Sequence, residues 1–262
     1  MSETHHPRRG IYVLPTLFTV GNLFCGFASL VHASTGNIEL ASVFILVGAV
    51  LDALDGRIAR LTRSTSAFGI EFDSMADVVS FGLAPAFLMF HWELRSMGRI
   101  GWLVTFLYVV CAATRLARFN IRAARNDKRY FAGLPSPAAG CVLASAAFAF
   151  PHAPAAPWLV TSVAGFVFAV AALMLSRVRY RSFKDFDLRN RRSYVYVLPM
   201  AAVLVLVAVF PTAVFLLLTI GYVVSGPGVY AWNLLSHGRV SGPMTANDSG
   251  RDREAMDEPV VR

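Results

Sequence analysis

Long apolar runs follow one another through most of this chain, and they restrict its fold more than any other feature. Several runs reach about 18–20 residues, which as an α-helix is enough to cross the ~30 Å hydrocarbon core of a membrane. Of the 262 residues, 56% are hydrophobic and only 15% are charged, whereas soluble domains average roughly 25% charged residues. A soluble helical bundle would need polar stripes at the 3.6-residue helical period, and most of these runs lack them. The sequence therefore predicts an all-α fold, a polytopic membrane helix bundle.

The runs divide the chain into an expected series of eight transmembrane helices. Residues 1–13 form a polar N-terminal arm, residues 14–235 the transmembrane domain, and residues 236–262 a polar tail that we expect to be disordered. The first run could alternatively be a cleaved signal peptide, because Val31-His32-Ala33 resembles a cleavage site. The expected spans are Leu14–Ala33, Glu39–Leu61, Phe72–His91, Ile100–Leu116, Pro137–Phe150, Trp158–Leu175, Tyr194–Phe210 and Thr212–Trp232.

The distribution of basic residues predicts how these spans are oriented. Of the 24 Lys and Arg residues, only Arg95 and Arg99 fall on one side, between the third and fourth spans. Because basic residues concentrate in cytoplasmic loops, we expect both termini and the turn between the second and third spans to face the cytoplasm. The net charge of +8 then reflects loops next to membrane lipids, and we expect no nucleic-acid partner. Arg far outnumbers Lys, and Ala and Val are abundant, as in GC-rich bacterial genomes.

Four aspartates, Asp52, Asp55, Asp73 and Asp77, stand within a strongly apolar part of the sequence. If the flanking runs are helices, the spacing puts Asp52 and Asp55 on one helix face and Asp73 and Asp77 on another. Ionisable residues near membrane depth cost about 2.5–3.5 kcal/mol each on insertion scales, and they are usually functional. Converging carboxylates repel one another unless some are protonated or bound to metal. Oxygen ligands select hard cations such as Mg²⁺, Mn²⁺ or Ca²⁺, so the stretch favours a metal site.

The residues alone leave three interpretations of these aspartates open. They could carry out metal-assisted chemistry, or they could line the pathway of a cation transporter. They could instead form a structural network with the arginines of the intervening turn, Arg57, Arg60 and Arg63. Such pairing accounts for one or two of the carboxylates, so we favour metal-assisted chemistry.

The spacing within this stretch narrows the alternatives. Across 26 residues it follows the pattern Asp52-x2-Asp55-Gly56-x2-Ala59-Arg60-x8-Gly69-x3-Asp73-x3-Asp77. This pattern resembles in full the signature of the CDP-alcohol phosphatidyltransferase family, and the number of fixed positions makes the resemblance specific. The residue types suit the ligand, since Gly56 and Gly69 permit close backbone approach and Arg60 is a fork-shaped cation suited to phosphate.

Other segments resemble one branch of that family, the integral-membrane phosphatidylserine synthases of bacteria. The resemblance covers roughly residues 11–235, and eight spans fit this branch better than the smaller number usual in others. Thr16 departs from the pattern, because such sequences commonly carry Asn after the proline. The similar segments are Leu14–Phe27, Glu71–Ala86, Arg115–Asn120 and Phe131–Pro137.

The resemblance implies a reaction and a set of residue roles. The phosphatidyl group of CDP-diacylglycerol would pass to the hydroxyl of L-serine, giving phosphatidylserine and CMP. The resemblance also implies a multi-pass protein of the bacterial cytoplasmic (inner) membrane and a homodimer. It further implies a two-metal site with Mg²⁺ or Mn²⁺, and Asp77 as the catalytic general base. The implied metal ligands are Asp52, Asp55, Asp73 and Asp77. The implied CDP-binding residues are Asp55, Gly56, Arg60 and Gly69.

The acceptor is predicted less directly. Serine carries a carboxylate and an ammonium group, so we expect an additional cation near the metals. Arg115 and Arg118, at the end of the fourth span, are candidates for binding serine or phosphate, as is the basic segment Arg177–Lys184. These arginines could instead obey the positive-inside rule or touch anionic lipid headgroups. A sister enzyme with choline, glycerol phosphate or an inositol compound as acceptor stays open, as does the cation transporter.

Overall fold

The computed structural model describes residues 13–62, 66–124, 133–152 and 156–176, and the single positions 217 and 221. The described residues form helices and no strand, which confirms the prediction of an all-α bundle. The predicted spans 194–210 and 212–232 lie outside the described residues, apart from positions 217 and 221, so the count of eight spans stays a prediction. The tail 236–262 also lies outside them, and so does the N-terminal arm apart from its last residue. The elements are α1 (Val13–Ser34), α2 (Ile38–Thr62), α3 (Ala67–Asp77), the π-helix η2 (Val78–Leu83), α4 (Ala84–Trp92), the 3₁₀-helix η3 (Leu94–Met97), α5 (Arg99–Ala124), α6 (Ser136–Ala149) and α7 (Pro157–Leu175).

The helices have the length and surface of a membrane protein. α2 has the length of a span, with 25 residues, whereas α6, with 14 residues, is shorter than the ~20 that a spanning helix needs. Large apolar side chains such as Phe24 on α1 and Trp102 on α5 are more than half exposed, as expected for a surface that faces lipid. Within the described residues, the segments long and apolar enough to cross a membrane are Thr16–Ser34, Ala67–Trp92, Arg99–Ile121 and Pro157–Leu175.

The third predicted span consists of α3, η2 and α4, which follow one another without a break. It begins at Ala67 rather than at the predicted Phe72, because Ser66 caps the helix. The Ser66 Oγ accepts a hydrogen bond from the backbone N–H of Gly69 at 2.9 Å, which satisfies one of the free N–H groups of the first turn. The earlier start places Gly69 on the same helix as Asp73.

The fourth predicted span also extends beyond its expected boundary. α5 continues past Leu116 to Ala124, so the polar segment Arg115–Asn120 is helical. One continuous helix therefore contains both the apolar span and this polar segment.

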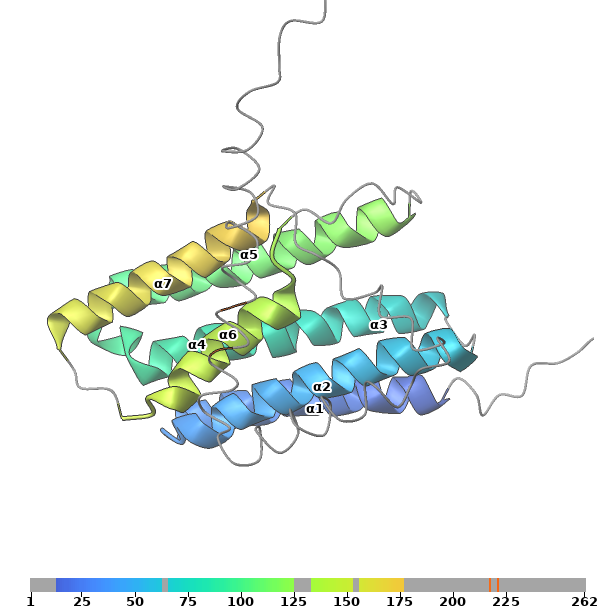
Figure 1. Ribbon diagram of the computed structural model, residues 1–262, viewed down its shortest axis with the longest axis horizontal. Coiled ribbons are helices and arrows are strands. Elements are labelled where there is room, and N and C mark those ends of the chain that lie inside the picture. The colour runs from blue at the N-terminus through green and yellow to red at the C-terminus, as the bar shows by residue number, and fades with distance from the viewer. Residues whose placement is uncertain are drawn as a thin grey trace, which may run out of the picture. The chain divides into compact units, whose positions relative to one another are not determined.

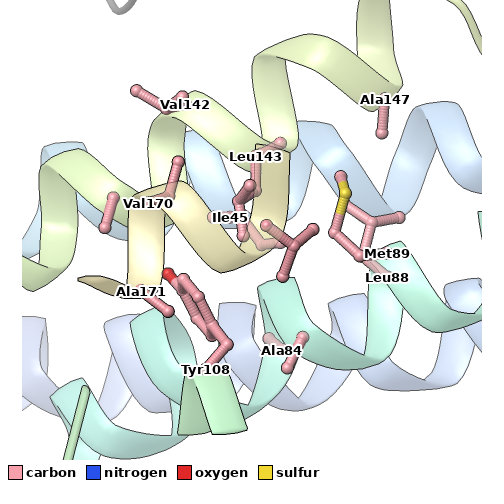
Figure 2. Close-up of a cluster of buried hydrophobic side chains, with 14 of the residues drawn as sticks. Ile45, Ala84, Leu88, Met89, Tyr108, Val142, Leu143, Ala147, Val170 and Ala171 are labelled. Atoms are coloured by element: carbon pink, nitrogen blue, oxygen red, sulfur yellow. The ribbon is translucent and has the colours of Figure 1, made fainter. Parts of the chain in front are cut away.

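The helices pack around a shared apolar core. α1 lies beside α2, and α5 lies beside α7 (Figure 1). Figure 2 shows buried side chains from five helices that meet in this core: Ile45 of α2, Leu88 of α4, Tyr108 of α5, Leu143 of α6 and Val170 of α7. α4, α5 and α6 are thereby held against one another next to η2.

Candidate metal centre

Three of the four predicted aspartates converge from α2 and α3. Asp52 and Asp55 come from the C-terminal half of α2 and Asp73 from α3, and one carboxylate oxygen of each lies within 4.8 Å of the others. Asp55 is 4% exposed, and the other two are half-buried. The Oδ1 of Asp73 is buried and has no hydrogen-bond partner within the described part of the chain. A buried oxygen without a hydrogen-bond partner destabilises the folded chain, and a bound cation would provide that partner. Three carboxylates at this separation fit a hard divalent cation.

Asp77 borders this cluster from one helical turn further along α3. The residue is only 9% exposed, and its carboxyl group interacts electrostatically with those of the other three aspartates. It is not one of the three residues whose oxygens lie within 4.8 Å of one another. Its roles as a metal ligand and as a general base therefore stay predictions.

α1 supplies hydrogen-bond donors to two of these aspartates. The Thr19 Oγ1 donates to Asp55 Oδ2 at 3.1 Å, and the Asn22 Nδ2 donates to Asp77 Oδ1 at 3.4 Å. Both donors are buried, and Asn22 is 0% exposed. A buried polar side chain in an apolar helix is costly without a hydrogen-bond partner, and the two aspartates provide these partners. α1 therefore forms a third wall of the site, next to α2 and α3.

Sequence reasoning did not identify either donor as part of the site. A signal was present, because the two polar residues lie three positions apart, on one face of an apolar helix. That spacing alone does not say which carboxylates they meet.

Apart from Asp55 itself, the residues predicted to bind CDP lie on the same two helices as the clustered aspartates. Gly56 follows Asp55 on α2 and is half-buried. Gly69 lies in the first turn of α3, where its N–H takes part in the Ser66 cap. Arg60 belongs to α2, but its side chain lies outside the described residues. CDP binding by these positions stays a prediction.

Of the two candidate arginines on α5, only Arg115 is shown to interact with the site. It is half-buried, its Nη1 donates to Ser136 Oγ at 2.8 Å, and it interacts electrostatically with Asp77. Arg118 is exposed. The basic segment 177–184 lies outside the described residues.

Further along α5, Asn120 ties this helix to α3. Its Nδ2 donates to Ser74 Oγ at 2.9 Å, and Ser74 follows Asp73 directly. Together with the contact between Arg115 and Ser136, this bond joins three segments that are far apart in the sequence. The polar end of α5 thus lies beside the aspartate helix.

Comparison with known proteins assigns the chain to a family. A family model described as CDP-alcohol phosphatidyltransferase matches residues 12–178. A CDP-diacylglycerol–serine O-phosphatidyltransferase of Helicobacter pylori (strain J99) is 40% identical over 183 residues, covering 68% of this chain and 76% of the relative. A protein of the same name from Bacillus subtilis (strain 168) is 33% identical over 180 residues, covering 69% and 96%. The family model spans the helices that form the aspartate cluster, and the chain therefore belongs to the CDP-alcohol phosphatidyltransferase family.

Proposed function

We propose that this chain transfers the phosphatidyl group of CDP-diacylglycerol to the hydroxyl of L-serine, giving phosphatidylserine and CMP. The observation that carries the proposal is the convergence of Asp52, Asp55 and Asp73 in a chain whose curated relatives are named for this reaction. The acceptor and the residue roles below extend that observation.

The carboxylates would hold divalent cations, Mg²⁺ or Mn²⁺. Asp52, Asp55 and Asp73 would be ligands, with Asp77 completing a two-metal site. Cations held there would supply positive charge that offsets the negative charge developing on the phosphate groups during the displacement. The unpartnered Oδ1 of Asp73 supports this assignment, because it is an acceptor that the described residues leave unused.

Asp77 would accept the proton of the serine hydroxyl. The serine oxygen then forms a bond to the phosphorus that bears diacylglycerol, and the bond from that phosphorus to the CMP oxygen breaks. Asn22 donates to Asp77 Oδ1, which helps to orient the carboxylate for this proton transfer. Asp55, Gly56, Arg60 and Gly69 would bind the CDP group.

Arg115 is the residue we assign to the serine carboxylate. It is half-buried and close enough to Asp77 to interact with it electrostatically, so an amino acid bridging the two would present its hydroxyl to the base. A planar guanidinium suits a carboxylate, which it can bind through two parallel hydrogen bonds. The exposed Arg118 is more suited to lipid headgroups.

We further propose a homodimer in the bacterial inner membrane, with the site and both termini on the cytoplasmic side. The distribution of basic residues supports this orientation. Serine and released CMP are soluble, so a cytoplasmic site gives both of them direct access.

A serine-dependent CMP-release assay tests the proposal. The purified full-length chain, CDP-diacylglycerol and Mn²⁺ or Mg²⁺ should release CMP when L-serine is added, and EDTA should stop the release. Asp77→Asn should abolish turnover while CDP-diacylglycerol still raises the melting temperature of the protein. The matched control is Glu71→Gln, an exposed carboxylate on the same helix, which should keep full activity.

Two results would contradict the proposal. CMP release with choline, glycerol phosphate or inositol but not with serine would make the chain a sister enzyme. Near-normal turnover by Asp77→Asn would refute its assignment as the base.

A further inference from the structure

The helix that carries Asp73 and Asp77 changes its winding directly after Asp77. Val78–Leu83 form the π-helix η2, and the next backbone N–H, that of Ala84, bonds the carbonyl of Val79, five residues back. Single π-turns inside α-helices are rare and are frequently found at functional sites. The change in winding therefore begins at Val78, directly after Asp77, the residue proposed to be the base.

Pro85 explains why the winding changes here. Proline has no backbone N–H, and in an α-helix its ring clashes with the carbonyl four residues earlier. That carbonyl belongs to Phe81, which lies in η2. A wider turn before Pro85 relieves the clash, but the Phe81 carbonyl still lacks the amide that would bond it in an α-helix.

Tyr108 of α5 supplies a donor to this carbonyl. Its hydroxyl donates to the Phe81 carbonyl oxygen at 3.0 Å, and the tyrosine is 0% exposed. In an apolar core, both a phenol hydroxyl and a carbonyl released from the helix need a partner. This one hydrogen bond therefore gives both the Tyr108 hydroxyl and the Phe81 carbonyl a partner.

A second set of contacts connects η2 to Asn22, the residue that donates a hydrogen bond to Asp77. The Ser80 Oγ donates to the backbone carbonyl of Asn22 at 2.9 Å, and the Asn22 side chain donates to Asp77. α1 can approach this closely because residue 26 is glycine, since a Cβ on Gly26 would lie 2.9 Å from the Cα of Ser80. The π-turn and the orientation of Asp77 therefore share one set of contacts.

We propose that Tyr108 is a positioning residue for Asp77. Its hydroxyl replaces the backbone amide that Pro85 lacks, and it thereby holds η2 in its π winding. That winding sets the direction of the Asp77 carboxylate and of Asn22, which holds it. The effect on Asp77 rests on the proposed function, whereas the relation between Tyr108 and Pro85 does not.

A double-mutant cycle on the full-length purified chain tests the relation without substrate. Tyr108→Phe leaves the Phe81 carbonyl without its donor, and we expect the melting temperature to fall by about 2–4 °C. Pro85→Ala restores the backbone N–H, so adding Tyr108→Phe to it should lower the melting temperature by less than about 1 °C. Pro85→Ser restores the same amide and gives a second background. The control is Ser145→Ala, which removes a buried hydroxyl that has no partner among the described residues and should not lower the melting temperature.

Kinetics test the effect on Asp77. Tyr108→Phe should lower kcat about ten- to a hundredfold, the range expected when a reacting group is misplaced. The KM values for serine and CDP-diacylglycerol should change by less than about twofold, because Tyr108 is fully buried in the apolar core. Ser145→Ala should keep its kcat.

The outcomes separate the two proposals. If Tyr108→Phe lowers the melting temperature equally in the wild type and in the Pro85→Ala and Pro85→Ser variants, Tyr108 is not a substitute for the missing amide. A lower melting temperature with unchanged kcat, or a loss confined to KM, would overturn the positioning role. If the wild type shows no serine-dependent CMP release, the proposed function fails, while the substrate-free cycle still decides the relation between Tyr108 and Pro85.

Discussion

The hydrogen bond from Asn22 to Asp77 offers a direct measure of what α1 contributes to the reaction. Asn22→Leu removes the donor and keeps a side chain of similar size. Hydrogen bonds to charged groups contribute about 1.5–3 kcal/mol, and the length of 3.4 Å puts this one at the lower end. A loss of about 1.4 kcal/mol corresponds to a tenfold change in rate, so we expect kcat to fall about tenfold in the CMP-release assay.

Stability should respond differently from activity in this variant. Asn22→Leu also removes the Oδ1 atom, which is buried without a hydrogen-bond partner among the described residues. Removing that atom stabilises the folded chain, whereas the lost donor to Asp77 destabilises it. Because the two effects oppose each other, we expect the melting temperature to change by less than about 3 °C.

Thr19→Val is the matched control, since Thr19 donates to Asp55 from the same helix at 3.1 Å. Asp55 is a proposed metal ligand rather than the base, so this variant should need about tenfold more Mn²⁺ for half-maximal activity. Its kcat at saturating Mn²⁺ should stay close to that of the wild type. An unchanged kcat in Asn22→Leu, or equal losses of kcat at saturating metal in both variants, would refute the reasoning.

Three further predictions concern the metal, the acceptor and pH. Asp73→Asn should abolish the rise in melting temperature on adding Mn²⁺ and lower activity at least about a hundredfold; a retained Mn²⁺ effect would contradict the cluster. Arg115→Lys should raise the KM for serine about tenfold but not that for CDP-diacylglycerol, because lysine cannot form the paired bonds of a guanidinium; Arg118→Lys should leave both unchanged. Burial raises the pKa of Glu93, between α4 and η3, above its ordinary value of 4.5, so its charge destabilises the folded chain at high pH. Glu93→Gln should therefore raise the melting temperature at pH 8, with a gain that disappears below about pH 4.5; a gain independent of pH would contradict burial as its cause.

The helical membrane fold and the aspartate cluster could be predicted because each depends on a strong local signal. Apolar runs of membrane length leave helices as the main option, and the spacing places Asp52 and Asp55 on one helix face and Asp73 and Asp77 on another. Helix ends were less predictable, because they depend on single side-chain contacts. The Ser66 cap moves the start of α3 to Ala67.

The remaining features of the site depend on tertiary contacts that one sequence does not display. Asn22 and Thr19 are visible as polar residues in an apolar run, but which carboxylates they meet depends on how α1 packs. Pro85 signals a disturbed helix, yet proline can cause a kink, a break or a wider turn. Here the donor that stabilises the wider turn, Tyr108, comes from another helix altogether.

The bond between Thr19 and Asp55 also bears on how the chain enters the membrane. α1 and α2 are neighbours in sequence and lie side by side, so they can insert as a helical hairpin before α3 is synthesised. A carboxylate that enters the bilayer on α2 costs about 2.5–3.5 kcal/mol. The hydroxyl of Thr19 on α1 can offset part of this cost by donating a hydrogen bond to Asp55. We therefore expect Thr19 to assist the insertion of the acidic second helix, so Thr19→Val should lower the yield of membrane-inserted protein.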